Sequence, residues 1–144
     1  MIRGLVLACA LFLSTAVAAE EPGRWTLYGP PKVTFIAEQV GSFENGVKDA
    51  LVPVLKRHAI ARAYLIAVRY EASYLPKPEN SVALCLESDI PVGDEQIAVA
   101  RDVSEVFKKQ AGRETHLDVI FLTAEQLPRA RQVANPFYAG EQAK

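Results

Sequence analysis

The amino-acid sequence predicts an α+β fold in which two long helices lie on one face of a mainly antiparallel sheet. Two long segments carry apolar residues at helical spacing, and short apolar segments rich in β-branched residues flank them. Their order is strand, helix, strand, strand, helix, strand, and then a short helix. This is the ferredoxin-like, split βαβ order. Right-handed crossovers then place both long helices on the same face of the sheet.

The first strand and first long helix are predicted in the segment from residue 32 to residue 58. Residues 32–40 contain closely spaced β-branched and aromatic side chains and are expected to form a strand. Apolar residues then recur every three or four positions as far as His58, which predicts a helix that Ser42 or Asn45 would cap. Pro53 removes one helical hydrogen bond, so we expect a kink near it.

Two apolar strands are predicted in the middle of the chain. Residues 60–71 show little sign of a polar face and are expected to form a central strand that is covered on both sides. Residues 72–81 contain Pro76, Pro78 and Asn80 and are expected to form a loop. Residues 81–88 follow as a second apolar strand, and the two strands together could form a hairpin with a long loop.

The second long helix is expected between two turn signals. Residues 89–93 predict a turn, and Asp94 can cap the helix. Gly112 lies at the end of the helix, where a residue in the left-handed conformation is favoured. The remaining elements are a strand over residues 117–123, a short helix over residues 124–133, and a tail with the sequence Asn135-Pro136-Phe137-Tyr138.

The first 19 residues have the pattern of a secretory signal peptide. Arg3 is followed by an uncharged apolar run and then by small residues, which predicts cleavage before Ala19 or Glu20. The run is shorter than the roughly 20 residues of a spanning helix, so no integral membrane segment is expected after cleavage. Residues 20–31 form an arm in which Trp25 is expected to dock on the domain. Residues 32–144 form that domain, in the periplasm or outside the cell.

Charge and cysteine content exclude several classes of protein. The 16 basic and 17 acidic residues nearly cancel, which argues against a nucleic-acid-binding arm or an electrostatic membrane anchor. Cleavage removes Cys9 and leaves Cys85, so no internal disulfide is expected. His58 and His116 are the only histidines, and no metal-ligand spacing or cofactor motif accompanies them. The sequence therefore predicts neither a metal nor a cofactor.

Candidates for catalysis are weak. Cys85 stands between two leucines in a predicted strand, where a thiol behaves as a small hydrophobic residue. An enzyme would require Cys85 to meet His58, His116 or Asp118. The carboxylates that are close together in sequence are expected to be solvated or to cap helices, rather than to form an acid–base pair. They are Glu87 with Asp89, and Asp94 with Glu95.

Aromatic side chains are the better candidates for binding, because tyrosine combines a large contact area with a polar tip. We select Tyr70 in the second strand, Tyr74 in the following loop, and Pro136, Phe137 and Tyr138 near the chain end. The alternative is that some of these side chains fill gaps in the core or at its edge.

Four short segments resemble the C-terminal domain of the enhanced serine sensitivity protein (SseB) family, in order and spacing. They are residues 51–58 (LVPVLKRH), 61–65 (ARAYL), 117–122 (LDVIFL) and 135–138 (NPFY). The resemblance implies a small α+β module with a characteristic Pro-Phe-Tyr end, and a helix that tolerates Pro53. The family has no defined catalytic mechanism, so no catalytic residue is implied. Its members combine this domain with a second one and look cytoplasmic, whereas a signal peptide and a single domain are expected for this chain.

Three functions are consistent with these observations. The first is a non-enzymatic exported module that binds a protein partner in the cell envelope. The second is a sensor or carrier of an amino-acid-like small molecule, held between the sheet and the arm near Trp25. The third is a Cys/His enzyme. A sheet face that two helices leave open also makes a homodimer an expectation.

Overall fold

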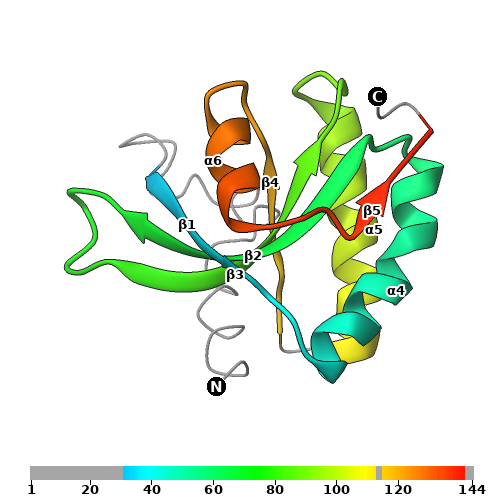
Figure 1. The fold of residues 1–144 in the computed structure, drawn as a ribbon, viewed down its shortest axis with the longest axis horizontal. Coiled ribbons are helices and arrows are strands. Elements are labelled where there is room, and N and C mark those ends of the chain that lie inside the picture. Colours follow the sequence, from blue (N-terminus) through cyan, green and yellow to red (C-terminus); the bar gives the residue numbers. More distant parts are fainter. Residues whose placement is uncertain (1–30, 113–114, 142–144) are drawn as a thin grey trace.

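The structure is a computed structural model that describes residues 31–112 and 115–141 (Figure 1). The predicted signal peptide and almost all of the predicted arm, Trp25 included, lie outside the described residues. In chain order the elements are β1 (Lys32–Glu38), α4 (Ser42–Arg57), β2 (Arg62–Glu71), β3 (Glu79–Glu87), α5 (Asp94–Ala111), β4 (Asp118–Phe121), α6 (Gln126–Val133) and β5 (Tyr138–Ala139).

The predicted fold class is confirmed: the protein is α+β, with a five-stranded, mainly antiparallel mixed sheet. The strands are neighbours in sequence order, β1-β2-β3-β4, and β5 also pairs with β2. The β1–β2 and β2–β3 pairs are antiparallel, whereas β3 and β4 are parallel and α5 connects them. From β1 to β4, strands that are consecutive in the sequence are therefore also neighbours in the sheet.

The two long helices cover one face of the sheet and α6 lies on the other (Figure 1). The α4 and α5 helices run antiparallel, because Gly46 at the start of α4 lies near Gln110 at the end of α5, while His58 after α4 contacts Asp102. The core on this face includes Leu51, Leu55, Ala63, Leu65, Leu84, Val99, Val103 and Phe107. The core under α6 includes Phe35, Tyr64, Ile66, Val68, Ala83, Cys85 and Ala130.

Glycines, and not side-chain caps, precede both long helices. Gly41 and Gly93 are the N-cap residues, with φ angles of 141° and 137°, and no side chain caps either helix. The expectation that Ser42, Asn45 or Asp94 would cap is therefore wrong. These φ values strain any residue with a Cβ, and at Gly41 a Cβ would also collide with the carboxylate of Glu44.

The C-terminal ends of the two long helices lie close to the positions predicted from the sequence. Gly112 ends α5 with a φ of 111°, and its amide donates to the carbonyl of Lys108 at 2.8 Å. The α4 helix continues through Pro53 to Arg57. The chain then turns at Ala59, whose φ of 56° lies in the left-handed region.

Two segments differ from the sequence prediction. β3 begins at Glu79, inside the predicted loop, because the ladder with β2 extends to the Tyr70–Glu79 pair. The predicted tail forms β5, where the amide of Phe137 donates to the Ala63 carbonyl at 2.9 Å. Since β1 pairs with β2 only from Ile66 onward, the first part of that edge is free to accept β5.

Candidate functional site

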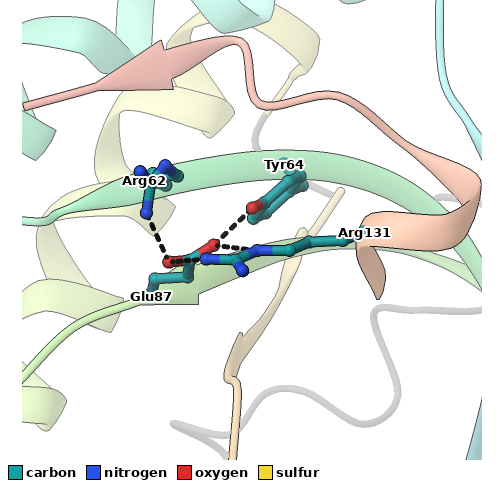
Figure 2. Close-up of polar contacts among 4 residues, drawn as sticks. All are labelled: Arg62, Tyr64, Glu87 and Arg131. Atoms are coloured by element: carbon teal, nitrogen blue, oxygen red, sulfur yellow. Dashed lines mark hydrogen bonds and ion pairs between the residues drawn. The ribbon is translucent and has the colours of Figure 1, made fainter. Parts of the chain in front are cut away.

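A polar cluster of four residues surrounds the carboxylate of Glu87 (Figure 2). Arg131 donates to both carboxylate oxygens, from Nη2 at 3.0 Å and from Nε at 3.2 Å. Arg62 Nη1 donates to Oε1 at 3.0 Å, and the hydroxyl of Tyr64 donates to Oε2. We call these four residues the Glu87 network. One carboxylate therefore accepts hydrogen bonds from three side chains.

Three elements bring the Glu87 network together. Arg62 and Tyr64 lie two residues apart on β2 and therefore point to the same face of the sheet. Glu87 is the register partner of Arg62 on β3, and Arg131 reaches it from α6. The side chain of Glu87 is only 10% exposed, whereas that of Arg131 is 49% exposed. The network thus fixes α6 over the ends of β2 and β3.

The charge of Glu87 is stabilised by its partners. Burial by itself would raise the pKa of Glu87, but the hydrogen bonds from Tyr64, Arg131 and Arg62 outweigh it and hold the pKa below its ordinary value. Burial, and then the hydrogen bond to Glu87, raise the pKa of Tyr64. Glu87 therefore stays ionised and Tyr64 stays neutral near pH 7, which suits a structural ion pair better than proton transfer.

The expectation that Glu87 is solvated is wrong. Its strand position gave a usable signal, because Ser81, Cys85 and Glu87 are separated by even numbers of residues on β3 and so share one face. Cys85 on that face is fully buried. Arg131 gave no comparable signal, since nothing in the sequence places α6 above the end of β3.

A second polar cluster lies on the same face of the sheet. The carboxylate oxygen Oδ2 of Asp118 accepts hydrogen bonds from the hydroxyls of Tyr70 and Ser81, both at 2.7 Å. Tyr70, Ser81 and Asp118 are each no more than 2% exposed. They come from β2, β3 and β4, so this cluster connects three adjacent strands in the interior.

A third cluster connects the two long helices on the opposite side of the sheet. His58 Nε2 lies 2.8 Å from Oδ2 of Asp102 on α5, and Nη2 of Arg57 lies 3.4 Å from the same oxygen. The hydrogen bond with His58 lowers the pKa of Asp102 below its ordinary value, and Arg57 lowers it further. His58 thus contacts a carboxylate that stays ionised near neutral pH.

The structure does not place Cys85 beside His58. Cys85 lies in the core under α6, whereas His58 belongs to the layer of the two long helices. Burial, and then the nearby carboxylate of Asp118, raise the pKa of the Cys85 thiol far above its ordinary value. Burial and Lys108 of α5 lower the pKa of His116. A neutral buried thiol is a poor nucleophile, so this grouping lends the enzyme hypothesis no support.

The predicted binding residues lie toward two ends of β2. Tyr70, near its C-terminal end, is 1% exposed and is part of the core, which is the alternative left open by the sequence. Tyr74 packs against the same core and is partly buried. Pro136 is exposed. Phe137 and Tyr138 are partly buried beside the start of β2, with Nζ of Lys48 lying 5.9 Å from the Phe137 ring centre.

Large exposed apolar side chains gather in two short segments of the described chain. Ile36, Val40 and Phe43 lie at the β1–α4 connection and are 42%, 68% and 40% exposed. Val92 and Ile97 lie at the start of α5 and are 90% and 55% exposed. We call these groups the β1–α4 patch and the α5 patch. Sequence periodicity did not single them out, because both fall where one element gives way to the next.

Comparison with known proteins gives no match: no family model, no curated protein and no solved structure matches the chain. The resemblance to the SseB family therefore stays a prediction. Among the described residues, no helix has the length and apolar character needed to cross a membrane, and no group of three or more His, Cys, Asp or Glu side chains could hold a metal ion.

We expect Glu87→Gln to destabilise the fold by about 2 kcal/mol at pH 7, since hydrogen bonds to a charged group are lost. The folded-state pKa is below the unfolded value of about 4.3, so the ionised form stabilises the fold above that pH and this contribution is lost as the pH falls through the folded-state pKa. Urea unfolding should therefore show the two proteins converging below about pH 4. Glu105→Gln, at an exposed position, is the control and should stay within about 0.5 kcal/mol of wild type. A loss independent of pH would contradict this account.

The thiol of Cys85 should not react with an aromatic disulfide reagent at pH 8 in the native chain expressed from Glu20 onward, which lacks Cys9. Its burial excludes the reagent and its raised pKa disfavours the thiolate. Full reaction should appear once urea unfolds the chain, as measured by release of the coloured thiolate. Rapid labelling of the native protein would show instead that Cys85 is accessible and would revive the enzyme hypothesis.

Proposed function

We propose that the protein is a non-enzymatic exported module that binds a protein partner in the cell envelope. The observation that carries this proposal is the gathering of exposed apolar side chains in the β1–α4 patch and the α5 patch. Single exposed apolar residues are ordinary, but groups of them mark interaction surfaces more often. The SseB family that the sequence resembles has no defined catalytic mechanism, so the resemblance supplies no catalytic residue that would favour an enzyme instead.

The edges of the sheet favour side-chain docking over strand addition. β1 carries a bulge between Phe35 and Ala37, so Ile36 is the extra residue in its ladder with β2. β4 is only four residues long and begins with the inward-facing, buried Asp118. Bulges, short edge strands and inward charges all discourage pairing with a further strand. The partner is therefore expected to contact side chains in the patches.

Site-specific photo-crosslinking tests this proposal. A photoreactive amino acid placed at Val40 or at Val92 should give a discrete adduct with an envelope protein in intact cells, because these two side chains are among the most exposed apolar ones. The same amino acid at the exposed Lys109 is the control and should give none. Failure of both patch positions, or equal adducts at all three, would sink the proposal.

Export is a separate part of the proposal and rests on the signal-peptide pattern of residues 1–19. We expect the intact mass of the purified mature protein to correspond to a chain that begins at Ala19 or Glu20. Replacing Leu7 with Arg interrupts the apolar run, so the uncleaved precursor should accumulate. A wild-type protein that retains Met1 in the cytoplasm would contradict export and the envelope location of the partner.

The alternative is a carrier of an amino-acid-like molecule. A thermal-shift screen of amino acids, serine included, distinguishes it, because a ligand that binds the folded state raises the melting temperature. Stabilisation by one amino acid, together with no crosslinking at either patch, would favour the carrier over the protein-binding module.

A further inference from the structure

A hollow of about 340 Å³ lies beside the α5 patch, between the end of α4 and the connection from β3 to α5. Its volume falls within the range of small binding pockets. Residues from both sides of the hollow contribute to its lining: His58, Ala59, Asp89, Ile90, Pro91 and Glu95. The hollow thus has an apolar wall and two carboxylates.

Negative charge around the hollow is not neutralised by the described residues. Asp89, Asp94 and Glu95 form no ion pair in the part of the chain that the structure describes. The nearby arginines are paired elsewhere, Arg57 with Asp102 and Arg62 with Glu87.

Two further contacts complete the electrostatics of the hollow. Arg101 also lies within ion-pair distance of Asp102, at 3.7 Å. His58, the one basic side chain in the lining, faces the same carboxylate. The C-terminal end of α4 and the first turn of α5 both border the hollow, so the opposite ends of their helix dipoles offset each other there, and the carboxylates of Asp89 and Glu95 set its charge. A cation is therefore the charge that this hollow favours.

The apolar surface extends beyond the hollow. Val92 directly follows the lining residue Pro91, and Gly93 with its φ of 137° sets the turn that presents Val92. Ile97 lies two residues beyond the lining residue Glu95 on α5 and is also exposed. A free small cation could neutralise the carboxylates, but it would leave these two apolar side chains in water. A larger ligand, with a cationic side chain flanked by apolar ones, would cover both.

We infer that the hollow and the α5 patch together bind a basic segment of the partner protein, with an Arg or Lys side chain in the hollow and neighbouring aliphatic side chains on Val92 and Ile97. The apolar stem of such a side chain matches Ile90 and Pro91, and its charged head matches Asp89 and Glu95. This inference rests on the proposed protein-binding function and specifies the chemistry of the partner.

The test uses the mature protein labelled with ¹⁵N and the peptide acetyl-Ala-Leu-Arg-Leu-Ala-amide as the probe. Titration should shift the amide signals of residues 89–97 other than Pro91, which has no amide proton, and the dissociation constant should rise steeply with added salt. Citrulline in place of Arg keeps the shape and removes the charge, and should weaken binding roughly tenfold.

Matched variants assign the effect to the hollow. Glu95→Gln and Asp89→Asn should each weaken binding of the Arg peptide roughly fivefold, since each removes one attractive charge. Glu105→Gln removes an exposed charge from the same helix outside the hollow, and should leave the affinity unchanged. Unchanged amide signals in the rest of the sheet verify that each variant is folded.

Four results would overturn the inference: no shifts at residues 89–97, equal affinity for the citrulline peptide, an equal loss in Glu105→Gln, or ethylguanidinium binding as tightly as the peptide. The last result would indicate a small organic cation. A crosslink at Val92 without peptide binding would overturn the inference that the partner segment is basic, and would leave the proposed function in place. Peptide binding without any crosslink in cells would contradict the proposed function instead.

Discussion

The pairing of β2 with β3 is the constraint on which the rest of the structure depends. Their ladder runs without interruption from Arg62–Glu87 to Tyr70–Glu79, and every other strand pairs with one of these two. Both strands carry buried side chains on both faces, so each face needs a covering layer. The helices α4 and α5 supply one layer and α6 covers part of the other.

Polar groups inside this arrangement are placed where elements must be held together. The Glu87 network attaches α6 at one end of the β2–β3 pair, and the Tyr70–Ser81–Asp118 cluster joins three strands toward the other end. His58 and Asp102 connect α4 to α5. In each case a carboxylate is within hydrogen-bond distance of more than one side chain, and for the largely buried Glu87 and Asp118 these bonds offset the cost of burying the charge.

Much of the fold could be predicted from local pattern. The helices α4, α5 and α6 and the strands β1 and β2 lie close to their expected positions, because amphipathic spacing and apolar runs are properties of single segments. The caps and β5 could not be predicted in this way. The N-cap position of each long helix is occupied by a glycine at positive φ and not by the adjacent Ser42 or Asp94. The strand β5 forms where β1 leaves part of the edge of β2 unpaired.

The candidate surfaces were less predictable than the fold. Tyr70 is apolar enough for the core and polar enough for a surface, and its partner Asp118 lies 48 positions away. Glu87 shares a strand face with the buried Cys85, which was a usable signal of its burial, but its partner Arg131 lies 44 positions away and gave none. The α5 patch depends on exposure at a junction between elements, and no periodic pattern encodes exposure there.

The antiparallel packing of α4 and α5 sets the distance between the two exposed patches. The β1–α4 patch lies at the start of α4 and the α5 patch beside its end, so the 16 residues of that helix separate them by about 24 Å. Side chains so far apart share no neighbours, and the free energies of substitutions in the two patches should simply add. The molecule therefore presents two thermodynamically independent surfaces, and one partner would have to span the whole helical layer to engage both.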